Sequence, residues 1–145
     1  MYPDAKVSEF ITKNFVPARF HVKEQGEAFQ RFGAQWTPTI EILDPSGKEQ
    51  HRIEGFLPVD DFLSQLHLGL GHAAFKTGKF EDAERWFRSV VEKFPNTDAA
   101  AEAQYWAGVS RYQRSHDGAE LKAIADAFKK RYSDSTWAKK ASVWA

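Results

Sequence analysis

The spacing of apolar and polar residues predicts mixed elements at the front of the chain. Apolar residues recur at helical spacing over residues 4–14, after a Pro-Asp start in which Asp4 can cap the helix. Residues 15–22 alternate between apolar and polar side chains, which predicts a strand. A short helix is expected over residues 26–32, and Gly33 is placed to end it.

A β-hairpin is predicted next. The apolar run at residues 40–43 leads into Asp44-Pro45-Ser46-Gly47, which has the residues that turns prefer. Residues 48–54 alternate enough to form the returning strand. Pro58 then opens a helix whose apolar positions continue to Ala74.

Beyond Gly78 the pattern is helical throughout. Residues 81–94 carry one apolar face, and three more segments repeat this spacing up to the end of the chain. Residues 93–97 and 131–135 have similar sequences, so the chain repeats itself after 131 − 93 = 38 positions. Repetition at this period is typical of stacked helical hairpins. The predicted fold class is therefore α+β and rich in helix.

Composition excludes several functions. The 145 residues contain 20 Lys and Arg against 20 Asp and Glu, so no overall basic field favours nucleic acid or anionic lipid. The chain has no cysteine, which excludes disulfides, cysteine redox chemistry and thiolate metal sites within it. No apolar run is long enough for a membrane span, and Met1 is followed by no secretory leader, so we expect a cytoplasmic protein.

No metal site or cofactor site is expected. The five histidines form no ligand motif, and His67 and His72 lie five positions apart on one predicted helix, so they do not share a face. There is no glycine-rich phosphate loop and no nucleophile-elbow serine. The sequence predicts neither a catalytic residue nor a cofactor.

The helical half resembles the tetratricopeptide repeat (TPR) family. Six residues fall at the spacing of the TPR signature within one frame of about 34 residues: Gly71, Gly78, Phe80, Ala83, Phe87 and Pro95. A second, degenerate unit keeps Gly108. The resemblance implies a groove that takes extended peptide, lined by Leu68, His72, Phe75, Lys76, Tyr105, Val109, Arg111 and Tyr112. Because solenoids usually need about three units, the alternative is that these residues pack against the front half.

The front half resembles the C-terminal part of a thioredoxin-like domain. The Pro-Asp helix start, the alternating segment, Thr37-Pro38-Thr39 before an apolar strand, the Asp-Pro-x-Gly turn and Gly55-Phe56 carry the likeness. Together the two resemblances imply a thioredoxin-like portion over residues 1–70 and TPR-like helices over 60–145, which share one helix. The thioredoxin-like resemblance also implies a cis bond before Pro38.

The resemblance further implies that Trp36, Thr37 and Pro38 form a corner whose backbone binds extended substrate. The alternative is that Trp36 is a core residue or a dimer contact.

The family's first strand, first helix, second strand and cysteine motif have no counterpart in this sequence. The missing second strand normally lies between the strands that match residues 15–22 and 40–43. We therefore expect the two strands to pair directly, a second copy to pair with the exposed edge as a homodimer, or a partner to donate a strand.

These patterns predict a non-catalytic module that binds a partner polypeptide or a second copy of itself. One alternative is a fragment of a thiol-disulfide oxidoreductase whose Cys-x-x-Cys lies upstream of Met1. Another is a structural subunit of a larger assembly. The expected partners are proteins or peptides, and neither nucleic acid nor membrane.

Overall fold

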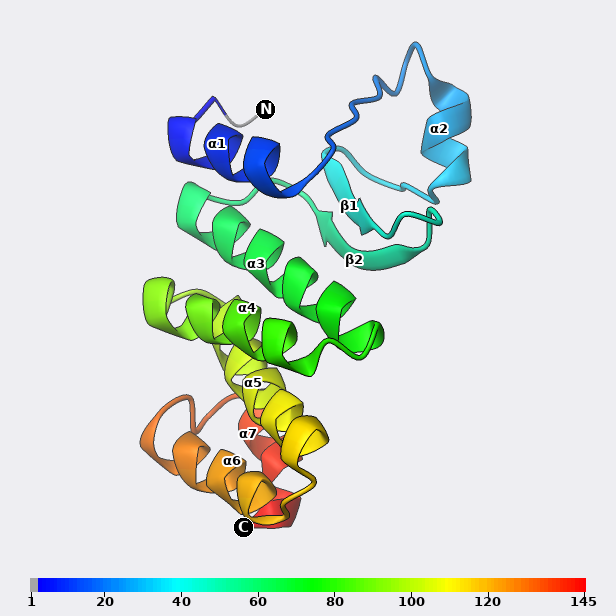
Figure 1. Ribbon diagram of the computed structural model, residues 1–145. Helices are drawn as coiled ribbons and strands as arrows, with labels where there is room; N and C mark the ends of the chain where they lie inside the picture. Colours follow the sequence, from blue (N-terminus) through cyan, green and yellow to red (C-terminus); the bar gives the residue numbers. More distant parts are fainter. Residues whose placement is uncertain (1–2) are drawn as a thin grey trace.

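The computed structural model describes residues 3–145, and its fold class is α+β and rich in helix, as predicted. Two short helices and a β-hairpin lie at one end of a stack of helices, as Figure 1 shows. In chain order the elements are α1 (Ala5–Asn14), α2 (Gly26–Arg31), β1 (Thr39–Leu43), β2 (Glu49–Glu54), α3 (Val59–Lys76), α4 (Phe80–Lys93), α5 (Ala99–Ser115), α6 (Ala119–Lys130), α7 (Thr136–Ala141) and a 3-10 turn, η1 (Ser142–Trp144).

Helix α1 begins where the sequence predicts. The Asp4 carboxylate accepts hydrogen bonds from the backbone N–H groups of Lys6 and Val7, which would otherwise have no partner at a helix start. Val7 is completely buried, so one face of α1 is anchored in the core.

The strand predicted over residues 15–22 is wrong. The segment contains no regular secondary structure, and residues 16–20 are all exposed. A strand is stable only when a neighbour pairs with its backbone, and no strand lies beside this one in the described part of the chain. The direct pairing of this segment with β1, one of the three predicted arrangements, is therefore not present among residues 3–145.

The hairpin is confirmed. Strands β1 and β2 pair antiparallel, with Ile40 opposite Ile53 and Glu41 opposite Arg52. The Asp44 carboxylate accepts hydrogen bonds from the backbone N–H groups of Ser46 and Lys48, which holds the turn closed.

Helix α3 packs on both sides. Phe62, Leu63 and Leu66 form one core cluster with α1 and the hairpin, whereas Leu68 belongs to a second cluster with α4 and α5. A third cluster, built around Ile124, joins α5 to α6 and α7. The hairpin and the helical stack are therefore joined through one helix rather than through a linker.

Glycines allow close helix contacts in the stack. A Cβ added at Gly71 would lie 2.5 Å from the ring of Phe87, and one added at Gly108 would lie 2.2 Å from Ile124 Cγ1. The first contact joins α3 to α4 and the second joins α5 to α6. Each of these two helix pairs therefore has a glycine at the point where its helices come closest.

Candidate protein-interaction site

One edge of β1 has no neighbouring strand among the residues that the structure describes. Gly55 N–H donates to Pro38 O, which sets the hydrogen-bond pattern, so Ile40 and Ile42 pair with β2 while Thr39 and Glu41 direct their backbone groups the other way. The sheet consists of β1 and β2 alone in residues 3–145. The outer edge of β1 is therefore open to an added strand.

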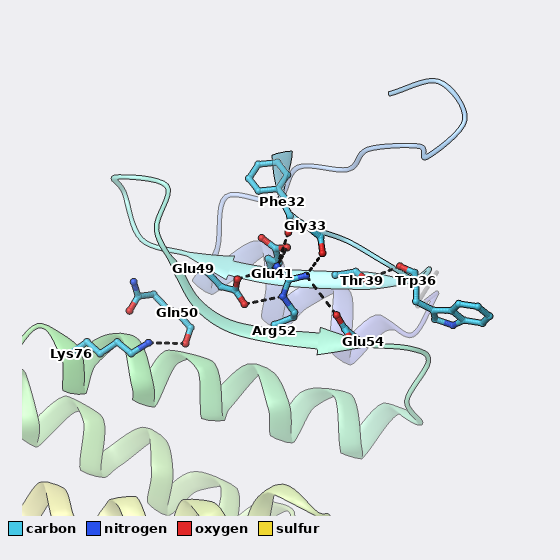
Figure 2. Close-up of polar contacts among 10 residues, drawn as sticks. All are labelled: Phe32, Gly33, Trp36, Thr39, Glu41, Glu49, Gln50, Arg52, Glu54 and Lys76. Carbon is cyan, nitrogen blue, oxygen red and sulfur yellow. Dashed lines mark hydrogen bonds and ion pairs between the residues drawn. The ribbon is translucent and has the colours of Figure 1, made fainter. Parts of the chain in front are cut away.

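Arg52 on β2 joins the hairpin to the end of α2. Its guanidinium donates to Phe32 O at 2.6 Å, to Gly33 O at 3.4 Å and to the Glu49 carboxylate at 2.9 Å. Figure 2 shows these groups gathered on one face of the hairpin. The arginine thus positions the loop that leads from α2 into β1.

Three carboxylates surround this arginine. Arg52 lies 2.7 Å from Glu41, 2.9 Å from Glu49 and 3.7 Å from Glu54. Three negative charges and one positive charge leave this cluster with a formal net charge of −2 when all four groups are ionised. Lys76 also acts electrostatically on Glu49, whereas the cation that acts on Glu41 is Arg52, and Glu49 adds a second negative charge beside it.

Glu41 is the most enclosed of the three carboxylates. Its side chain is 10% exposed, against 41% for Glu49 and 52% for Glu54. Glu41 Oε1 is buried and makes no hydrogen bond in aligned geometry, although Arg52 Nη2 is close to it. Burial raises the pKa of Glu41 above its ordinary value, and the charge of Arg52 only partly opposes this.

Exposed apolar side chains gather in this part of the sequence. Seven large hydrophobic residues are exposed in the described part of the chain, and six of them lie between residues 16 and 56: Val16, Phe20, Val22, Trp36, Leu43 and Phe56. Of these six, Leu43 lies on β1 itself and Trp36 lies three residues before its start, so two exposed apolar side chains are close in sequence to the open edge.

The corner at residues 36–38 lies just before β1. Trp36 is 69% exposed, so the alternative that it is a core residue is wrong. Figure 2 shows its indole pointing away from the hairpin. Thr39 Oγ1 donates to Trp36 O at 2.7 Å, and the bond between Thr37 and Pro38 is cis, as the resemblance implied.

The groove residues predicted on α3 have different environments. Leu68 is completely buried in the core between α3, α4 and α5, so it lines no open surface. His72 Nε2 lies 3.0 Å from Glu102 Oε1, and Phe75 packs edge-on against Trp106. Lys76 is exposed and donates to Gln50 O.

The groove residues predicted on α5 do not share one face. Tyr105 stacks on Trp144, and Val109 packs beside the cluster around Ile124. Arg111 instead pairs with Glu84 on α4 and Glu120 on α6. The reason is the helical period: Arg111 lies two positions after Val109, about 200° around the helix. The remaining residue, Tyr112, contacts the ring of His116.

Glu41, Arg52 and the other members of the charged cluster were not predicted from the sequence. The signal was nevertheless in the alternation, because polar residues in facing strands of a hairpin gather on the same side of the sheet. The hydrogen bonds from Arg52 to the carbonyls of Phe32 and Gly33 have no comparable signal in the sequence, since they depend on tertiary packing.

The front part of the chain is similar to a known family. Residues 1–69 match the family model of the thioredoxin-like domain. The front part, which holds the hairpin and the open edge, is thus a thioredoxin-like segment followed by helices. The match ends within α3, and the TPR-like character of the later helices stays a prediction. Comparison with curated proteins and with solved structures found no match.

Among residues 3–145, no helix combines the length and the apolar character needed to cross a lipid bilayer.

Proposed function

We propose that this chain is a protein-interaction module that captures an extended polypeptide strand at the outer edge of β1. The observation that carries the proposal is the open edge itself. Thr39 and Glu41 each direct one N–H donor and one C=O acceptor away from β2. A strand laid against this edge would satisfy these groups and extend the sheet, which is a common way to bind a peptide.

The side chains around the edge support the same proposal. A strand added beside β1 would place alternate side chains on the face where Ile42 and Ile53 are buried, and so could extend that core. The nearby exposed apolar residues Trp36 and Leu43 offer further contacts. Backbone pairing would give affinity, and these side chains would give selectivity.

In this proposal the helices act as a rigid, TPR-like support. Two observations favour TPR-like hairpins: the glycine contacts Gly71–Phe87 and Gly108–Ile124 are alike in the two helix pairs, and Tyr132 OH donates to Pro95 O across the repeat. Helix α3 buries the inner face of the hairpin and so fixes the direction of the β1 edge.

Amide hydrogen exchange of ¹⁵N-labelled protein tests this function. The N–H groups of Thr39 and Glu41 should exchange fast in the free protein, while those of Ile40 and Ile42, which bond to β2, exchange slowly. We expect a blocked heptapeptide, Thr-Thr-Val-Gln-Val-Thr-Thr, to slow exchange at Thr39 and Glu41 when it is titrated to millimolar concentration.

The matched control is the same peptide with an N-methyl group on its central residue, which removes the donor that would face β1. If neither Thr39 nor Glu41 gains protection from the unmodified peptide, the proposed function is wrong. Equal protection by both peptides would also contradict it, since strand pairing needs that donor.

A further inference from the structure

We infer that the strand captured by β1 is amphipathic and carries a lysine or arginine opposite Glu41. This inference rests on the proposed function and names the class of partner. Three features of the edge support it: the position of Glu41, the negative charge around it, and the repulsion that a second β1 strand would meet there.

The position of Glu41 comes first. Its N–H and C=O point out of the open edge, so a residue of the added strand would form a hydrogen-bonded pair with it. Side chains of directly opposed residues lie on the same face of a sheet, with Cβ atoms about 5 Å apart. The partner's side chain would therefore lie next to the Glu41 carboxylate, on the face that carries Arg52.

The excess of negative charge on the face that carries Arg52 favours a positively charged partner residue. Glu41, Glu49 and Glu54 share Arg52, and Glu41 Oε1 is buried without an aligned hydrogen bond. A buried carboxylate in this state is stabilised by a further donor or positive charge. The flanking residues of the partner would lie on the opposite face, beside Ile40 and Ile42, so they should be apolar. The partner strand that fits this edge therefore has a basic residue between two apolar residues.

The same charge disfavours a second copy paired edge to edge through β1. In an antiparallel register centred on Glu41, two Glu41 side chains would lie opposite each other, and like charges in that position destabilise a sheet. A partner strand with a basic residue avoids this repulsion. The complementary charge therefore favours a different polypeptide over a β1–β1 dimer.

Three peptides test the inference without changing the protein. They share the sequence Thr-Thr-Val-Xaa-Val-Thr-Thr, with Lys, Gln or Glu at the central position, and binding is followed by amide exchange at Thr39 and Glu41. We expect the Lys peptide to bind about tenfold more tightly than the Glu peptide at low salt, with Gln between them. The difference should shrink as salt is raised, because screening weakens the charge contact.

A pair of protein variants provides the control. Glu41→Gln should remove most of the preference for Lys over Glu, whereas Glu92→Gln, on the exposed surface of α4, should leave it intact. Circular dichroism and the amide spectrum establish that both variants are folded.

The outcomes separate the two proposals. If the Lys and Glu peptides bind equally well, the charge rule is overturned and strand capture stands. If no peptide protects the edge, strand capture itself fails. Protection that rises with protein concentration in the absence of peptide would identify a second copy as the occupant, and would overturn the inference.

Discussion

The ring of Phe10 lies parallel to the imidazole of His67, with ring centroids 4.4 Å apart and planes inclined by 15°. Phe10 comes from α1 and His67 from α3, and Trp86 of α4 meets both rings edge-on. Ser89 Oγ donates to Trp86 O and lies 2.7 Å from His67 Nδ1, so the ring nitrogen is best assigned as the donor to this oxygen. This buried neutral histidine ties three helices together.

His67 should make stability depend on pH. Burial lowers its pKa to about 4, with a smaller contribution from Lys93, whereas the unfolded chain takes up the proton near pH 6.5. Between these values the unfolded state binds more protons, so stability falls as pH falls. We expect the contribution of His67 to the free energy of unfolding to be about 2 kcal/mol lower at pH 5 than at pH 7, measured by urea denaturation.

The variant His67→Phe isolates this effect, because it keeps an aromatic ring but cannot take up a proton. Its unfolding free energy should depend less on pH than that of the unmodified protein. His21→Gln, which alters an exposed histidine in the segment before α2, should retain the full dependence. Equal pH dependence of the original protein and His67→Phe would contradict the prediction.

Gly69→Ala should loosen the hairpin from α3. A Cβ at this position would lie 2.2 Å from Ile42 Cδ1 and 3.2 Å from His51 Cβ, and both side chains belong to the hairpin. Overpacking of this kind typically costs about 1–3 kcal/mol. Thermal and urea unfolding would measure it. Gly118→Ala is the matched control, since its Cβ would meet open space, and it should change stability by no more than about 1 kcal/mol.

Arg52→Gln should destabilise the loop between α2 and β1. The change removes hydrogen bonds to Phe32 O and Gly33 O and leaves Glu41 buried without its cation. We expect a loss of about 1–3 kcal/mol in the free energy of unfolding and faster amide exchange in that loop. Arg88→Gln removes an exposed ion pair with Glu92 and should cost less than about 0.5 kcal/mol. Similar losses in the two variants would mean that the Arg52 cluster contributes no more than a surface pair.

Tyr132→Phe should weaken the contact between the two helical hairpins. The hydroxyl donates to Pro95 O at 2.6 Å, 37 positions earlier in the chain. Loss of one partly buried hydrogen bond costs about 1 kcal/mol, which urea denaturation can resolve. Tyr112→Phe removes a hydroxyl with no hydrogen bond in the described part of the chain, and should be close to neutral. A neutral Tyr132→Phe would show that the bond to Pro95 is dispensable.

Most of the elements follow from local pattern. The Asp4 cap, the turn at Asp44 and the break at Gly78 all depend on short-range chemistry, which a sequence contains in full. The helix periodicity similarly predicts the apolar faces of α3 to α6. These features needed no knowledge of which elements would meet.

The strand prediction for residues 15–22 was wrong because strand formation depends on long-range pairing. The alternation of this segment is a correct sign of strand propensity, but a strand also depends on a neighbour, and local pattern says nothing about neighbours. The charged cluster around Arg52 was missed on similar grounds, because the carbonyls of Phe32 and Gly33 come from another element. The peptide groove stays a prediction, although Arg111 lies on another side of α5 from Val109 and pairs with Glu84 and Glu120.

Helix α3 contributes side chains to two hydrophobic cores, so the chain cannot be divided beside it without exposing one of them. Phe62 and Leu66 face the hairpin core, and Leu68 faces the core of the helical stack. A cut before α3 uncovers the first core, and a cut after it uncovers the second. We therefore expect the two parts to unfold together. Recombination that moved either part into another protein would have to include α3. The part left behind would then lack the helix that covers its core.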